Sequence, residues 1–301
     1  MPHVHSHSHA PALAVPAHLA RTFVIGIGLN LIFVILEAGM GFWLKSLALL
    51  SDAGHNLSDV ISLVLALAAI KISQRQPNDQ YTFGYNKSTI LVSLFNAILL
   101  MLAVGAIGWE AIQRIGHTPP LDGGWIAAVS GVGIVVNAAT AYLFLKDKDH
   151  DMNVKGAYLH MAADALVSLG VVVSGLLILF TGWTGADTVM SFIVIVVIVW
   201  GTWGLLKESL RLTLDGVPKG VDLTAIRRYL YSIPGVQEVH DLHIWAMSTT
   251  ENSLTVHLVM LPSEENQLPL IHDALYHQFN ISHATIQIEE PGIGEQCLHS
   301  H

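Results

Sequence analysis

Residues 46–70 read SLALLSDAGHNLSDVISLVLALAAI, an apolar stretch that contains one histidine and two aspartates. A helix needs about 20 apolar residues to cross the hydrocarbon core of a membrane, and this stretch exceeds that length. His55 and Asp59 are four residues apart, so a helix projects both side chains from one face. Because ionisable side chains are unfavourable inside a membrane, their presence here indicates a functional site.

The whole chain has the composition of a membrane protein. Its 301 residues are 52% hydrophobic and 12% charged, and this charged share is about half that of an average soluble domain. Apolar stretches long enough to span a membrane occur near residues 20–43, 46–70, 88–112, 123–145, 157–181 and 186–206. They predict an all-α, six-helix transmembrane domain over residues 20–208.

Basic residues at the ends of these predicted spans fall mainly on one side. That side holds Arg21, Lys71, Arg75, Lys87, Lys146, Lys148, Lys155, Lys207 and Arg211, and the other holds Lys45 and Arg114. Lys and Arg are retained on the cytoplasmic side of membrane helices. We therefore expect a multi-pass membrane protein with both termini in the cytoplasm, in a bacterial inner membrane.

A second, cytoplasmic domain is predicted over residues 209–291, where the apolar stretches shorten and their period changes. The expected helices and strands follow the order αββαβ, at residues 223–233, 236–247, 253–261, 267–279 and 284–290. This order predicts a small α+β layer close to a ferredoxin-like fold that lacks one strand. Residues 1–19, which are rich in histidine, and 292–301 are predicted to be flexible tails.

Charge and cysteine content restrict the function. The formal net charge is −9 with only 14 Lys and Arg residues, which is unlike the basic patch of a nucleic-acid-binding protein, so no nucleic-acid partner is expected. The single cysteine, Cys297, excludes an intramolecular disulfide scaffold. The tract of His3, His5, His7 and His9 either binds metal without a fold or is a tail without a role, and truncation distinguishes the two.

The fifth predicted span repeats the pattern of the second, because His160 and Asp164 are again four residues apart. If the two helices face each other, two imidazole nitrogens and two carboxylate oxygens form a set that suits tetrahedral Zn²⁺. The two carboxylates also neutralise a dication, so the loaded site is close to neutral in a low-dielectric surrounding. The sequence thus predicts a transport metal site of His55, Asp59, His160 and Asp164.

Other polar residues in the spans have a simpler interpretation. Asn30, Asn96 and Asn137 are predicted to hydrogen-bond between neighbouring helices. The sequence does not determine the direction in which the side chains of Glu37 and Asp52 point.

Strand alternation predicts a second metal site in the cytoplasmic domain. His243, His257 and Glu289 each alternate with the apolar residues of their strands, which places all three on the face away from the core. Imidazole is a common metal ligand, so the trio predicts a zinc site, with ordinary surface polar groups as the alternative. In the same hypothesis, further residues complete or duplicate this site: His283, Cys297, His299 and His301. His240 has no assignment.

Four motifs connect these features: SLALLSDAGHNLSDV at 46–60, YTFGYNK at 81–87, LHMAADALVSLGVVVSG at 159–175 and VHDLHIW at 239–245. In this order and spacing they resemble the cation diffusion facilitator family, in its zinc-transporting branch, and the resemblance covers residues 20–291. One departure is that Ser88 and Thr89 follow Lys87, where the family often has a glutamate.

The resemblance implies a homodimer in the lipid bilayer that exchanges cytoplasmic zinc for external protons by alternating access. It implies that His55, Asp59, His160 and Asp164 hold the transported ion, and that several relatives bind cytosolic zinc at the positions of His243, His257 and Glu289. It also implies that Lys87 and Asp215 form a salt bridge that interlocks the dimer.

Two other functions stay open. A membrane metalloenzyme would use zinc with an open coordination position to activate water, but the chain contains no HExxH-type motif. A membrane-anchored zinc sensor would leave the four ionisable residues of the spans without a role. We therefore expect a secondary active transporter rather than an enzyme.

Overall fold

The computed structural model describes residues 17–43, 47–113, 123–182, 186–261 and 267–291. The chain divides into two compact units, Met1–Leu205 and Leu206–His301. Each unit has its own hydrophobic core.

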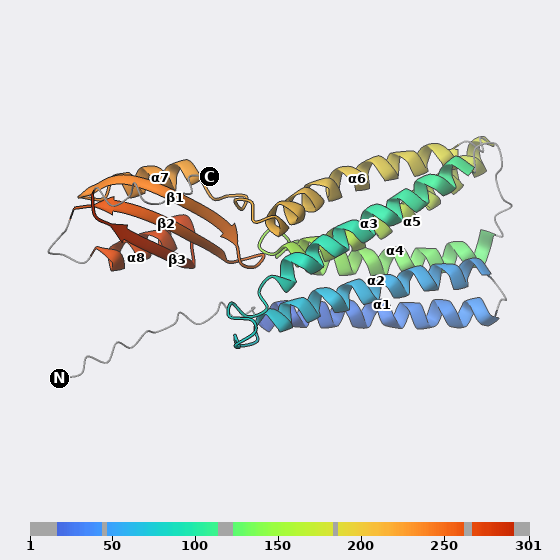
Figure 1. The fold of residues 1–301 in the computed structure, drawn as a ribbon. Helices are drawn as coiled ribbons and strands as arrows, with labels where there is room; N and C mark the ends of the chain where they lie inside the picture. Colours follow the sequence, from blue (N-terminus) through green and yellow to red (C-terminus); the bar gives the residue numbers. More distant parts are fainter. Residues whose placement is uncertain (1–16, 44–46, 114–122, 183–185, 262–266, 292–301) are drawn as a thin grey trace. The chain divides into compact units, whose positions relative to one another are not determined.

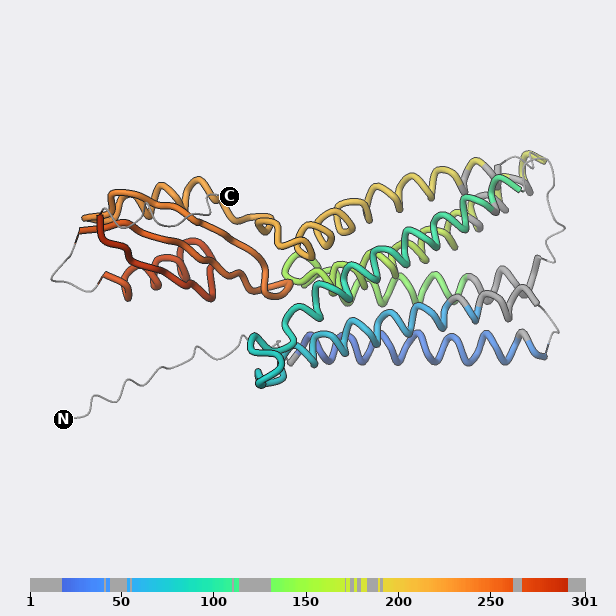
Figure 2. Tube along the Cα trace, viewed as in Figure 1, coloured from blue at the N-terminus to red at the C-terminus, as the bar shows by residue number. Residues whose placement is uncertain are grey.

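Long helices begin in the first unit, as Figure 1 shows. They are α1 (Ala17–Trp43), α2 (Leu47–Ser73), α3 (Ser88–Gln113), α4 (Gly123–Leu145), α5 (Met152–Thr181) and α6 (Ala186–Thr213). Figure 2 follows the chain as it passes back and forth through these helices. Within the described residues, four stretches are long and apolar enough to cross a membrane: His18–Met40, Asn56–Ser73, Ser88–Gln113 and Phe192–Thr213. The six predicted helices are all present, and the predicted helical membrane domain is confirmed.

Two of these helices are longer than the apolar pattern predicts. α5 begins at Met152 rather than near residue 157, because the Oδ1 of Asp151 accepts hydrogen bonds from the backbone N–H groups of Asn153 and Val154 at 2.7 and 3.2 Å. α6 continues past residue 206 to Thr213, where Arg211 donates to both oxygens of Glu208 within the last turns.

The helices of the first unit pack through apolar and polar contacts. Phe23 of α1 and Phe144 of α4 are fully buried, with ring centroids 4.8 Å apart. Next to them, the Nδ2 of Asn30 donates to the Oγ1 of Thr140 at 3.0 Å. The predicted helix-to-helix hydrogen bond is therefore confirmed for Asn30. Large apolar residues such as Ile35 and Trp200 face outward, as a lipid-facing surface requires.

The second unit is the predicted αββαβ layer. Its elements are α7 (Leu223–Tyr231), β1 (Val236–Ala246), β2 (Asn252–Met260), α8 (Leu268–Phe279) and β3 (His283–Glu289). The sheet order is β1-β2-β3, with β1 antiparallel and β3 parallel to β2. A parallel pair needs a long crossover, and α8 supplies it.

The two helices of this unit cover one face of its sheet. Ile226 of α7 and Leu275 of α8 belong to the same buried core as Leu254, Val256 and Leu258 of β2. Both helices therefore cover the face to which the even-numbered residues of β2 point. The odd-numbered His257 points to the opposite face.

A β-bulge interrupts β1. His240 pairs with His257 and His243 pairs with Thr255, so β1 has one residue more than β2 in this interval. Asp241 adopts the left-handed conformation, with φ 50°, which aspartate tolerates better than most residues. The extra residue reverses the alternation of side chains across the bulge, so His240 shares a face with His257.

Candidate metal sites

Three ligand side chains of α2 and α5 meet inside the helical unit. Asp59 on α2 and His160 and Asp164 on α5 have ligand atoms that all lie within 4.8 Å of one another. The Nε2 of His160 lies 2.5 Å from the Oδ1 of Asp59 and 3.8 Å from the Oδ2 of Asp164. We call these three residues the membrane cluster.

The membrane cluster is buried, which makes its charge important. Asp59 is only 2% exposed and His160 9% exposed. With a neutral imidazole, the two carboxylates carry a charge of about −2, which a divalent cation neutralises. One nitrogen and two oxygens supply three of the four ligands of tetrahedral Zn²⁺. His55 lies four residues before Asp59 on α2, but its side chain is outside the described part, so the fourth ligand stays a prediction.

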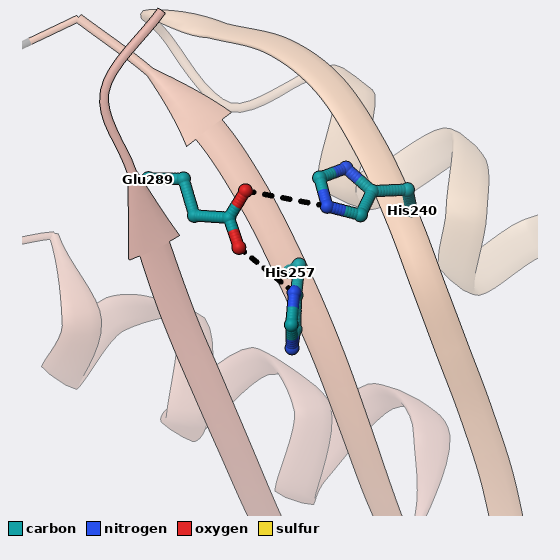
Figure 3. A group of neighbouring side chains, drawn as sticks. All are labelled: His240, His257 and Glu289. Atoms are coloured by element: carbon teal, nitrogen blue, oxygen red, sulfur yellow. Dashed lines mark ion pairs between the residues drawn. The ribbon is translucent and has the colours of Figure 1, made fainter. Parts of the chain in front are cut away.

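A second group lies in the C-terminal unit, on the face of the sheet opposite α7 and α8. Figure 3 shows His240, His257 and Glu289 projecting from β1, β2 and β3, with one carboxylate oxygen directed at each imidazole. The Oε2 of Glu289 lies 3.3 Å from the Nε2 of His240, and its Oε1 lies 2.9 Å from the Nδ1 of His257. We call these three residues the sheet cluster.

The sheet cluster fits a bound metal ion. Its ligand atoms lie within 4.8 Å of one another. Both ring nitrogens of His240 and the Nδ1 of His257 are buried and make no hydrogen bond within the described part of the chain. Buried polar atoms in this state are unusual, and a cation bound between the two imidazoles and the carboxylate would take one nitrogen from each ring.

The structure brings together a group that differs from the predicted trio by one residue. His257 and Glu289 are together as expected, but His240 joins them, because the bulge at Asp241 turns it onto their face. His243 is exposed and its Nε2 lies 2.9 Å from the Oδ1 of Asp241, whose Oδ2 is 3.6 Å from the Nε2 of His257. The hydrogen bond with His243 lowers the pKa of Asp241 and is the largest cause of that shift. Among the described residues, Asp241 thus links His243 to the cluster.

The remaining predicted residues lie elsewhere. His283 is the first residue of β3 and Glu289 is the last, so about 20 Å of strand separates them and His283 is not part of the sheet cluster. Cys297, His299 and His301 are outside the described residues. Lys87 is exposed just before α3 and Asp215 is exposed just after α6, and their pairing across a dimer stays a prediction.

Long apolar helices that could cross a membrane, with a buried cluster of His and Asp side chains between α2 and α5, are features of a multi-pass membrane protein. The family described as "Cation efflux transmembrane domain" matches residues 23–213, and "Cation efflux protein, cytoplasmic domain" matches residues 218–291. The chain belongs to the cation efflux family, which confirms the resemblance seen in its motifs. It is a transporter rather than an enzyme.

Curated relatives cover most of the chain. The "Cation efflux system protein CzcD" of Alcaligenes sp. is 38% identical over 288 residues, which are 95% of this chain and 89% of that protein. The "Zinc transporter ZitB" of Escherichia coli is 36% identical over 298 residues, 97% of this chain and 95% of that protein. The "Cadmium, cobalt and zinc/H(+)-K(+) antiporter" of Bacillus subtilis is 37% identical over 264 residues, 85% of each chain.

One solved structure is similar to part of the chain. It is described as "Metal-bound C-terminal domain of the CzcD transporter from Cuprividus metallidurans", with 41% identity and a TM-score of 0.21 over 23% of this chain and 99% of that one.

Proposed function

We propose that this protein is a proton-coupled antiporter that exports zinc from the cytoplasm by alternating access. The observation that carries the proposal is the membrane cluster, where the ligand atoms of Asp59, His160 and Asp164 lie within 4.8 Å of one another. In the proposal His55 completes this site. The ligand set of nitrogen and oxygen suits Zn²⁺, and relatives named as zinc transporters support this cargo.

Proton exchange follows from the chemistry of the ligands. Zinc binds neutral imidazole and ionised carboxylate, so protons on His160, Asp59 or Asp164 compete with the ion. An empty site with two carboxylates attracts protons, and a proton gradient then drives release of zinc on the far side. The Bacillus subtilis relative is named as an antiporter of metal ions against protons and potassium, which supports the coupling.

The proposed orientation follows the basic residues of the helix ends. Nine Lys and Arg residues lie beside one set of ends and two beside the other, which favours cytoplasmic termini by the positive-inside rule. The relatives named above are bacterial, and a bacterial inner membrane is the proposed location.

The sheet cluster would hold a resident zinc ion with His240, His257 and Glu289 as ligands. Cys297 lies eight residues beyond Glu289, a distance of up to about 26 Å along the chain. The C-terminal tail is therefore long enough to supply a fourth ligand from Cys297 or His299.

In this proposal two chains form a homodimer, held in part by Lys87 of one chain and Asp215 of the other. Zinc bound in the cytoplasmic domain adjusts the rate of transport.

Zinc uptake into proteoliposomes under an imposed pH gradient tests the proposed function. The wild-type protein should accumulate zinc when the lumen is acidic, and dissipation of the gradient should slow uptake. His257→Ala should change the zinc concentration at which transport is half-maximal without abolishing flux. Zinc bound by the wild-type protein without any flux would instead support a sensor, and uptake that ignores the pH gradient would contradict proton coupling.

A further inference from the structure

A small cavity borders the membrane cluster. It is lined by Asp59, Ser62 and Leu63 of α2, Asn96 of α3, and Gly156, Ala157 and His160 of α5. Its volume is about 10 Å³, which is room for about one water molecule. Two of its lining residues, Asp59 and His160, belong to the membrane cluster, so a water in this cavity touches the transport site.

Asn96 brings an acceptor to this cavity. Its side chain is 7% exposed, and its Oδ1 is buried without a hydrogen-bond partner among the described residues. Asn30 is also buried, at 2% exposed, but its Nδ2 donates across to the Oγ1 of Thr140 at 3.0 Å. The helix-to-helix hydrogen bond predicted for Asn30, Asn96 and Asn137 is seen for Asn30, and the Oδ1 of Asn96 needs another explanation.

Asn96 is the innermost of several buried polar residues that begin at the helix ends. Thr89, Ser93 and Asn96 are spaced by four and three residues on one face of α3, and all are buried. Asn153 of α5 lies on the same helical face as His160, is 0% exposed, and neither polar atom of its amide has a hydrogen-bond partner in the described part. A polar track therefore leads inward from the start of α3 and the start of α5.

This track begins at the ends that carry the basic residues of the α2–α3 and α4–α5 connections, which the proposed orientation places in the cytoplasm. An incoming dication must exchange its bound waters for His160, Asp59 and Asp164. Waters bound to a dication are strong hydrogen-bond donors, and an uncharged oxygen that accepts from them lowers the barrier without trapping the ion.

We propose that Asn96 is a positioning residue on the cytoplasmic approach, where its Oδ1 accepts a hydrogen bond from the last water that the cation keeps before it enters the membrane cluster. This inference rests on the proposed function. It concerns a residue outside the ligand set, and Asn96 acts through the water rather than on the ion itself.

The test measures zinc uptake by proteoliposomes as a function of zinc concentration for Asn96→Leu, which keeps the size of the side chain and removes the amide. Loss of a hydrogen bond to a charged group should raise the KM roughly 10- to 100-fold. The maximal rate should stay within about twofold of wild type, since the ligands are unchanged. Asn96→Gln, which keeps an uncharged amide oxygen at this position, should retain a KM closer to that of wild type than Asn96→Leu does.

Asn30→Leu is the matched control, because it removes the same amide from a buried site that has a partner. It should lower the melting temperature and leave the KM unchanged. Asn96→Ala is made in parallel, and decides by the same criterion if Asn96→Leu does not fold. An unchanged KM in folded Asn96 variants, or an equal rise in Asn30→Leu, would overturn the inference alone. Absence of flux in the wild type would overturn the proposed function and the inference with it.

Discussion

The membrane cluster and the sheet cluster use the same side chains in opposite proportions. Inside the helices, two carboxylates accompany one described imidazole, whereas on the sheet two imidazoles accompany one carboxylate. A bound dication gives the first set a net charge of about zero and the second a net charge of about +1. The side chains of His240 and His257 are 25% and 21% exposed, so solvent can stabilise that residual charge.

The difference teaches that the surroundings select the ligand set. A residual charge is strongly unfavourable between membrane helices, and it is tolerated at a sheet surface where water and counterions screen it. The neutral set suits an ion that must leave again, because protonation of either carboxylate weakens its hold. Changes of charge should therefore affect the two clusters to very different extents.

Asp59→Asn should give the largest effect. It keeps the shape of the side chain but leaves a loaded site with a positive charge between helices, and it removes a ligand oxygen. We expect the rate of zinc transport to fall by about 100-fold or more, since loss of a ligand exceeds the 10- to 100-fold cost of losing an outer-shell partner. Zinc flux in proteoliposomes measures the effect.

Asp79→Asn is the control for this change, because Asp79 is exposed in the segment between α2 and α3. It makes the same chemical replacement outside the cluster and should transport zinc as the wild type does. Equal melting temperatures would show that both variants fold. Normal transport by Asp59→Asn would contradict the role of the membrane cluster.

Glu289→Gln should have a smaller and different effect. The same loss of charge on the sheet raises the net charge of the loaded site from about +1 to about +2, and solvent screens part of this charge. The affinity of the cytoplasmic domain for zinc should fall roughly 10- to 100-fold, as measured by titration calorimetry on the full chain. The maximal transport rate should persist. A maximal rate as low as that of Asp59→Asn would remove the distinction between the two clusters.

The smallest expected difference separates two histidines of β1. His240→Ala removes a direct ligand and should weaken zinc binding at the sheet cluster about tenfold or more, since loss of a ligand costs at least as much as the 10- to 100-fold loss of an outer-shell partner. His243→Ala removes only a hydrogen bond to Asp241 and should weaken it about two- to threefold, in line with an exposed contact. Calorimetry on both variants compares them directly. A larger effect of His243→Ala would show that the residue predicted from the sequence is the true ligand.

These two histidines also show where sequence reasoning ends. Strict alternation along β1 placed His243 outward and gave His240 the parity of the core residues Leu242 and Ile244. The bulge at Asp241 breaks that parity, and an alternation rule cannot include an extra residue. The signal was present in Asp241 itself, since Asp is depleted in strands and tolerates positive φ.

The membrane domain was more predictable, because helix periodicity alone places His160 and Asp164 on one face. That α2 and α5 bring these residues next to Asp59 depends on packing between elements about 100 residues apart, which no local pattern encodes. Asn96 was harder still. Its residue type and apolar surroundings are those of Asn30, and only the position of Thr140 and of the cavity separates a structural amide from a functional one.

The central claim is that the ion crosses the membrane on the membrane cluster and not on the sheet cluster. Exchange of radioactive zinc across proteoliposomes loaded with unlabelled zinc, at equal pH on both sides, tests this directly, because exchange requires the ion site to face both sides. Wild type and Glu289→Gln should exchange zinc, and Asp59→Asn should not. Exchange by Asp59→Asn at the wild-type rate, or its loss in Glu289→Gln, would contradict the claim.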